Sequence, residues 1–151
     1  MKEFHNPIKL TTKNARILVT GATGYIGGRL IPRLLSSNFN VRVLVRDKEK
    51  IRNKSWYSQV EVFEGDLTKP ETLSRLPDGV DQAYCLIHSM SDSQDYIALD
   101  RLVAENFVTL FKDIKHVIYL GGISPDGPQI SDHLNSRIEV GKILSDSLPT
   151  T

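Results

Sequence analysis

Apolar residues along the chain form short β-branched runs that alternate with longer stretches of helical spacing. The runs predict five strands, because short apolar segments bounded by polar turns are typical of buried strands; they cover residues 15–20, 41–45, 60–63, 80–87 and 116–120. Apolar residues that recur every three or four positions predict three helices, at residues 25–35, 96–111 and about 134–144. A charged stretch between the second and third strands is expected to contain a short helix.

The regular alternation of strands and helices predicts the fold class. Such a chain needs crossover connections, which make the strands parallel and place helices on both faces of the sheet. We therefore predict an α/β protein with a doubly wound parallel sheet, the three-layer α/β/α Rossmann fold. Ligands of this fold bind at the carboxyl ends of the strands, so functional residues are expected directly after each strand.

A glycine-rich turn, TGATGYIGG, follows the first predicted strand and runs into the first helix. In its G-x-x-G-x-x-G spacing, the first glycine permits a tight turn, the second lets the backbone approach a pyrophosphate, and the third lets the helix pack closely. A loop that only happens to be rich in glycine is the alternative, but the position between strand and helix favours a phosphate site. The residues expected at the ligand are Gly21, Thr23, Gly24, Tyr25, Ile26 and Gly27.

The turn resembles that of the extended and atypical short-chain dehydrogenase/reductases, which reads T-G-x-x-G-x-x-G. The segments LVRD, EGDLT, AYCLIHSM, YLGGI and HLNSRIEVGKIL extend this resemblance over residues 15–148, and they are most similar to the NmrA-like and YbjT-like NAD(P)H-binding proteins. The resemblance implies a dinucleotide cofactor and an oxidoreductase-like activity. It does not imply a particular substrate.

Arg46 closes the second strand about twenty residues after the turn, where an acid would suit the ribose of NAD and an arginine a 2′-phosphate. Arg42 and Lys48 are expected to keep this neighbourhood positive, although Asp47 brings an acid within reach. NADP is therefore the predicted cofactor, with NAD possible. Alternatively, Arg46 is a solvated charge at the end of a strand.

Further cofactor contacts follow from the resemblance. It implies that Asp66 meets the adenine amino group while Leu67 flanks the ring, although Asp66 could instead cap a helix that starts near Lys69. It also directs the end of the fourth strand toward the cofactor riboses. The residues concerned are Leu86, Ile87 and His88, of which His88 by itself would more often be an ordinary loop residue.

The chemistry is less readable than the cofactor site. The resemblance leads us to expect a serine after the fifth strand and Y-x-x-x-K in the next helix, but His133 and Arg137 stand where the tyrosine and lysine belong. Histidine can transfer protons, yet a nearby arginine would lower its proton affinity. The catalytic residues are thus unknown, with Ser124, His133 and Arg137 as candidates. Cys85, inside a strand, is predicted to be a small core residue.

Composition narrows the class of protein. The 151 residues are 40% apolar and 25% charged, with a net charge of +1 spread along the chain, so no basic field favours nucleic acid or an anionic membrane. One cysteine and no zinc-ligand spacing predict no disulfide and no metal site, as in the reducing cytoplasm. Residues 1–14 are expected to be a mobile arm without a signal or membrane segment, and residues 15–151 one NAD(P)-binding domain that ends before a substrate-binding region.

Three functions are compatible with these residues. The first is an oxidoreductase-like NAD(P)-binding protein with an unknown small-molecule substrate. The second is a redox sensor that binds NADP(H) without turnover and reports to a protein partner, and the third is a non-catalytic assembly or scaffold protein. Exposed apolar surface at the end of the domain also makes a homo-oligomer a reasonable expectation.

Overall fold

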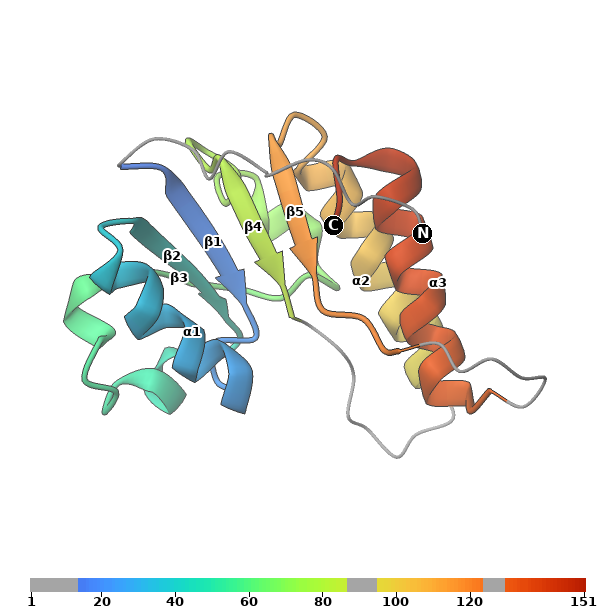
Figure 1. Ribbon diagram of the computed structural model, residues 1–151, viewed down its shortest axis with the longest axis horizontal. Coiled ribbons are helices and arrows are strands. Elements are labelled where there is room, and N and C mark those ends of the chain that lie inside the picture. The colour runs from blue at the N-terminus through green and yellow to red at the C-terminus, as the bar shows by residue number, and fades with distance from the viewer. Residues whose placement is uncertain (1–13, 87–94, 124–129) are drawn as a thin grey trace, which may run out of the picture.

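A computed structural model of the chain describes residues 14–86, 95–123 and 130–151 and contains a five-stranded sheet (Figure 1). All strand pairs are parallel, and the strand order is β3-β2-β1-β4-β5. The strands are β1 (Arg16–Thr20), β2 (Asn40–Val45), β3 (Glu61–Glu64), β4 (Gln82–Cys85) and β5 (His116–Tyr119). The doubly wound sheet predicted from the sequence is confirmed.

Helices cover both faces of the sheet. Helix α1 (Tyr25–Ser36) lies on one face, while α2 (Tyr96–Leu110) and α3 (Asp132–Ser147) lie side by side on the other (Figure 1). The other crossovers contain only 3-10 helices, namely η1 (Lys48–Ile51), η2 (Tyr57–Gln59) and η3 (Pro70–Leu73). The short helix expected between β2 and β3 is therefore two separate turns, each closed by bonds between residues three apart.

Two apolar clusters pack against the sheet, one on each face. Leu18, Val117 and Leu144 belong to the cluster under α2 and α3, whereas Ile17 and Ile31 belong to the cluster under α1. Neighbouring strand residues point to opposite faces, so a central strand buried on both sides is apolar at most positions. Cys85 is buried in the first cluster, which confirms its predicted place in the core.

The order of the strands reverses between β1 and β4. The chain moves from β1 outward through β2 to β3, then crosses back to β4 on the other side of β1 and continues to β5. The connections that leave β1 and β4 therefore diverge at the carboxyl ends of these two strands, where doubly wound sheets bind their ligands in a crevice. The glycine-rich turn follows β1 directly and lies at this point of reversal (Figure 1).

Residues 149–151 continue the sheet beyond β5. The N–H of Val117 donates to the carbonyl oxygen of Pro149 at 2.8 Å, and the N–H groups of Thr151 and Tyr119 complete a parallel pattern at 2.9 Å each. Val117 and Thr150 form a parallel bridge. The segment after α3 thus pairs with β5 as the next strand of a doubly wound sheet would.

The described residues contain neither a membrane-spanning helix nor a cluster of metal-binding side chains. No helix in these ranges combines the length and apolar character that crossing a membrane requires. Nor do residues 14–86, 95–123 and 130–151 bring three or more His, Cys, Asp or Glu side chains together as a metal site would.

Candidate functional site

Gly21 makes the turn at the carboxyl end of β1. Its φ angle is +72°, a conformation that side chains rarely adopt. A Cβ at this position would also lie 3.2 Å from the carbonyl oxygen of Leu86 and 3.3 Å from its Cβ. Two independent constraints therefore require glycine where the turn passes the end of β4.

The other two glycines bring the start of α1 onto this turn. The N–H of Gly24 donates to the carbonyl oxygen of Gly21 at 3.0 Å, and Gly24 is the residue that precedes the helix. A Cβ on Gly27 would stand 2.3 Å from the same oxygen, closer than any real contact. The tight packing expected of the third glycine is thus present, and it aims the helix axis at the turn.

The first turn of α1 offers unpaired donors. Within the described residues, the backbone N–H groups of Tyr25, Ile26 and Gly27 have no hydrogen-bond acceptor, and no side chain caps the helix. No acidic residue occupies the first turn. Free N–H groups at the positive end of a helix dipole form a favourable site for an anion.

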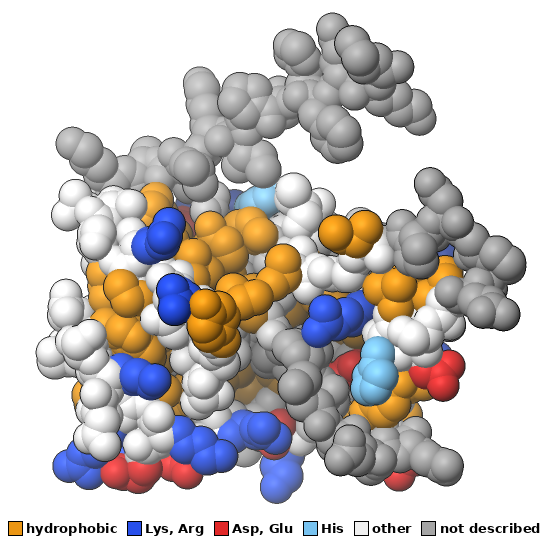
Figure 2. Space-filling model, turned by 60° about the horizontal axis from the view of Figure 1, so that its bottom comes forward, with side chains coloured by type: hydrophobic (Ala, Val, Ile, Leu, Met, Phe, Trp, Pro, Cys, Tyr) orange, Lys and Arg blue, Asp and Glu red, His pale blue; other side chains and the backbone are white. Residues whose placement is uncertain are grey.

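Exposed apolar and basic side chains surround this turn. The Tyr25 side chain is 75% exposed, and the Arg29 guanidinium lies 4.5 Å above the centre of its ring. Leu120 and Ile123, which follow β5, are also exposed. Figure 2, which looks toward the carboxyl ends of the strands, shows hydrophobic side chains interspersed with Lys and Arg on this face. Such a surface suits a ligand that combines flat rings with phosphates.

Thr20 is a functional residue that sequence reasoning missed. Its buried hydroxyl donates to the carbonyl oxygen of Tyr84 at 3.2 Å and accepts the N–H of Leu86 at 2.9 Å. The hydroxyl therefore ties the end of β1 to the end of β4 and holds Leu86 beside Gly21. A threonine directly before the glycine turn was the available signal. Ile87 and His88 lie outside the described residues.

Arg46 is exposed at the end of β2 and has no hydrogen bond or ion pair within the described residues. Asp47, by contrast, accepts the N–H of Glu49 at 3.0 Å and so caps η1. Lys48 forms an ion pair with Glu64 at 3.3 Å. Among residues 46–48, Arg46 is the one whose charged group has no partner within the described residues.

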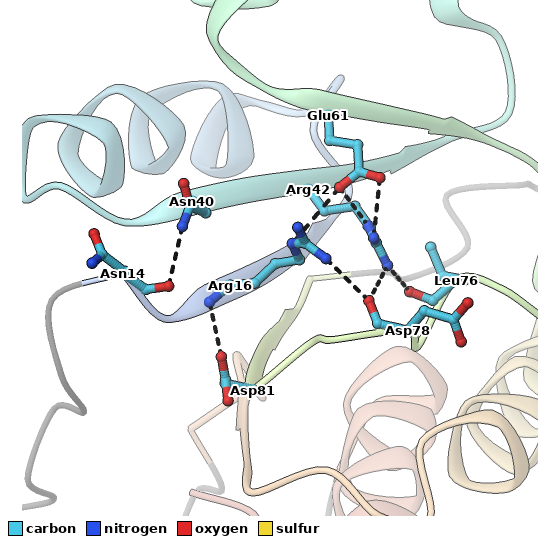
Figure 3. A network of polar contacts seen from close by, with 8 residues as sticks. All are labelled: Asn14, Arg16, Asn40, Arg42, Glu61, Leu76, Asp78 and Asp81. Carbon is cyan, nitrogen blue, oxygen red and sulfur yellow. Dashed lines mark hydrogen bonds and ion pairs between the residues drawn. The ribbon is translucent and has the colours of Figure 1, made fainter.

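Arg42 corrects one expectation, because it does not contribute positive charge at the cofactor end. It lies early in β2, and its guanidinium donates two hydrogen bonds of 3.0 Å to the Glu61 carboxylate (Figure 3). It also donates to the carbonyl oxygens of Leu76 and Asp78, which precede β4. Arg42 thus joins β2, β3 and the entry to β4 at the amino end of the sheet.

Asp66 follows β3 and closes a tight turn. One carboxylate oxygen accepts both the N–H and the hydroxyl of Thr68, each at 2.9 Å, just before η3. The predicted capping role is wrong, because η3 is preceded by Lys69 and no side chain caps it. Asp66 instead closes a turn with Thr68. Leu67 is 3% exposed in the core, so its side chain has little surface to offer an adenine ring.

A second group of polar and aromatic residues lies where α2 and α3 begin. The rings of Tyr96 and His133 stack with their centroids 4.5 Å apart and 17° between their planes. One turn deeper, the buried hydroxyl of Ser136 donates to the carboxylate of Asp100 at 3.0 Å. These contacts join the two helices that follow β4 and β5.

Tyr119 holds α3 against β5. Its hydroxyl donates to the carbonyl oxygen of Arg137 at 3.1 Å, and a Cβ on Gly141 would lie 3.2 Å from its ring. Burial raises the pKa of the Tyr119 hydroxyl to about 12. This phenol therefore remains protonated and acts as a structural contact. The candidate Ser124 lies outside the described residues.

Comparison with known proteins agrees with this architecture. The model of the NmrA-like family matches residues 13–128. The crystal structure of Citrobacter sp. triphenylmethane reductase complexed with NADP(H) is similar, with a TM-score of 0.73 and 26% identity; the match covers 89% of this chain and 47% of that one.

Two curated proteins resemble parts of the chain. The 3 beta-hydroxysteroid dehydrogenase/Delta 5-->4-isomerase of Mycobacterium tuberculosis is 33% identical over 75 residues, which are 50% of this chain and 20% of that protein. The ceramide reductase of Caulobacter vibrioides is 37% identical over 65 residues, or 43% of this chain and 20% of that protein. The matched segments thus span about a fifth of the length of these relatives.

Proposed function

Because the chain belongs to the NmrA-like family, we propose that it binds a nicotinamide dinucleotide in the turn between β1 and α1, as the nucleotide-binding part of a reductase. One observation carries this proposal. Three unpaired N–H groups at the start of α1 meet a turn whose glycines leave room for a pyrophosphate, at the crevice where the strand order reverses.

The related triphenylmethane reductase supports this choice of ligand, since its structure is complexed with NADP(H). The binding residues would be those of the turn, from Gly21 to Gly27, with Arg46, Asp66 and the backbone at Leu86 farther along the crevice. Ile87 and His88, which lie outside the described residues, complete the proposed set. Titration of the purified chain with NADPH and NADH, followed by calorimetry, tests the proposal, and absence of binding to either would overturn it.

We further propose that NADP is preferred over NAD, because Arg46 is exposed and unengaged while the neighbouring Asp47 caps η1. A carboxylate that is already hydrogen-bonded competes poorly for the ribose hydroxyls of NAD. A free guanidinium can bind a 2′-phosphate through two parallel hydrogen bonds.

Replacing Arg46 with alanine should therefore weaken NADP binding far more than NAD binding. A hydrogen bond to a charged group contributes about 1.5–3 kcal/mol, so the expected loss for NADP is about one to two decades in Kd. Calorimetric titration of both cofactors measures it. Arg52→Ala is the matched control, because Arg52 is an exposed arginine already paired with Glu49. Equal losses for both cofactors in Arg46→Ala would contradict the specificity role.

A second candidate function is a sensor that binds NADP(H) without turnover. The observation that favours it is the HLNSR segment, in which His133 and Arg137 replace the expected tyrosine and lysine. A sensor and a reductase would bind the cofactor equally well. They differ in whether NADPH is consumed when a carbonyl compound is added.

A further inference from the structure

The stacked rings of Tyr96 and His133, termed the Tyr96–His133 pair, are not explained by cofactor binding alone. Tyr96 is the first residue of α2 and His133 is the second residue of α3. These helices follow β4 and β5, so both rings lie at the carboxyl ends of the strands, on the side of the crevice away from β2 (Figure 1). That is the end of the sheet where ligands of this architecture bind.

The pair sits on a rigid base. One turn deeper in both helices, the buried Ser136 hydroxyl is bonded to the Asp100 carboxylate at 3.0 Å. Farther out, Arg101 and Glu139 form an ion pair at 2.6 Å. These two contacts bridge α2 and α3 without using either ring.

The stacking is not needed to build the core. The two helices already bury Val103, Phe107, Val140 and Leu144 between themselves and the sheet. His133 remains exposed, beyond this core. An exposed aromatic contact adds only about 0.5–1.5 kcal/mol, and any pair of apolar rings could supply it. The choice of an imidazole and a phenol at the mouth of the site therefore points to chemistry.

We propose that His133 donates the proton in the reduction of a carbonyl substrate and that Tyr96, stacked on the imidazole, is its positioning residue. This inference rests on the proposed dinucleotide-binding function. Imidazole is the side chain that exchanges protons near neutral pH. The stack on the Tyr96 ring, with centroids 4.5 Å apart, holds the imidazole in one plane at the start of α3.

The step would balance with groups already named. A reduced nicotinamide, when bound, would supply the hydride for the new C–H bond at the carbonyl carbon. The π electron pair of the carbonyl would pass to its oxygen, to which the His133 imidazolium would give the proton. The products are an alcohol, the oxidised cofactor and a neutral imidazole, which regains its proton from water because His133 is exposed.

Charged residues of both helices lie near the pair in the sequence. Asp132 precedes His133 in α3, and Asp100 lies one turn below Tyr96 in α2. Arg137 lies one turn farther along α3. Desolvation, followed by Asp132 and Asp100, raises the pKa of Tyr96. The phenol thus stays protonated, which leaves the proton transfer to His133.

The location of the pair can be tested without a substrate. We expect NADP+ to shift the NMR signals of the Tyr96 and His133 rings and to give nuclear Overhauser contacts from its nicotinamide protons. The adenosine fragment 2′,5′-ADP should shift the amides of residues 21–27 but leave both rings unchanged. If NADP+ shifts the amide signals of residues 21–27 but not the signals of the two rings, the proton-donor role alone is overturned. If neither ligand shifts the amide signals, the dinucleotide site is overturned, and the inference with it.

The chemical role is tested by NADPH oxidation with 4-nitrobenzaldehyde and diacetyl as carbonyl probes, across pH. His133→Gln should lower kcat about 100-fold and flatten the pH profile, with NADPH affinity unchanged, since proton transfer contributes about 10²–10⁴ in rate. Tyr96→Leu should lower kcat with a shifted profile, while Tyr96→Phe, which keeps the ring, should restore both. Arg101→Ala, which breaks a contact between the same helices, is the structural control.

Two outcomes would overturn the role of His133. One is turnover that persists in His133→Gln with an unchanged pH profile. The other is a chain that binds NADPH but reduces neither probe, a result that would favour the sensor.

Discussion

Alanine at position 27 should abolish dinucleotide binding, whereas alanine at position 28, the next residue of the same helix, should leave it intact. The Cβ of Gly27→Ala would fall 2.3 Å from the carbonyl oxygen of Gly21 and 2.9 Å from its carbonyl carbon. Both are backbone atoms, so either the turn or the helix must move. The nearest atom to a Cβ at position 28 is 3.9 Å away, which is an ordinary contact.

The expected size of the effect follows from what the turn must do. Overpacking of this kind costs about 1–3 kcal/mol of unfolding free energy, which the fold can survive. Displaced N–H groups can no longer converge on a pyrophosphate, so we expect the affinity for NADPH to fall at least 100-fold. Calorimetry measures the affinity, and thermal melting shows whether each variant is folded.

Gly24→Val separates loss of the site from loss of the fold. Gly24 is exposed, and its backbone is extended, with a φ angle of −80°. This backbone conformation is compatible with a side chain. That side chain would instead stand where the ligand backbone approaches the turn. A folded Gly24→Val chain with unchanged NADPH affinity would show that the dinucleotide binds elsewhere.

Replacement of Arg42 by leucine should clearly lower the stability of the fold. Its side chain is 5% exposed and donates to Glu61 and to the carbonyl oxygens of Leu76 and Asp78 (Figure 3). Leaving such groups without their hydrogen-bond donor costs about 1–3 kcal/mol of unfolding free energy, and the half-exposed Glu61 carboxylate can turn to water instead. Such a loss is substantial beside the about 5–15 kcal/mol that stabilises a typical domain.

Urea denaturation at two pH values tests the origin of this effect. The hydrogen bonds from Arg42 are the main cause that lowers the pKa of Glu61. The Glu61 carboxylate therefore stabilises the fold at pH values above the ordinary carboxyl pKa, and this contribution is lost as the pH falls. The difference in unfolding free energy between the wild type and Arg42→Leu should therefore be smaller at pH 3 than at pH 7. Arg75→Ala, at an arginine 86% exposed and paired only with Asp78, should cost less than about 1 kcal/mol. If Arg42→Leu and Arg75→Ala lose similar amounts of unfolding free energy, the structural role assigned to Arg42 is contradicted.

The fold and the geometry of the glycine-rich turn could be predicted because their signals are local. The spacing of Gly21, Gly24 and Gly27 depends on contacts among neighbouring residues, and the strands are marked by apolar runs. Arg42 could not be placed correctly, because its partners at positions 76 and 78 are brought to it only by the crossover from β3 to β4.

Other contacts of the candidate site depended on pairings that the sequence does not state. Thr20 gains its role from Tyr84 and Leu86, which reach it because β4 lies beside β1. Tyr96 meets His133 because α2 and α3 pack on the same face of the sheet. Asp66 bonds only to a near neighbour in the sequence, Thr68, yet the cap predicted for it is absent, because η3 begins after Lys69 without a side-chain cap.

The Thr20 hydroxyl has a consequence for local unfolding. One oxygen atom receives the amide of Leu86 and donates to the carbonyl of Tyr84, so the glycine turn cannot open by itself without freeing the end of β4. Segments that share such a bond open as one cooperative unit. The amide protons of Gly24 and Leu86, far apart in the sequence, would therefore exchange with solvent deuterium at a common rate, and ligand binding at the turn would slow both together.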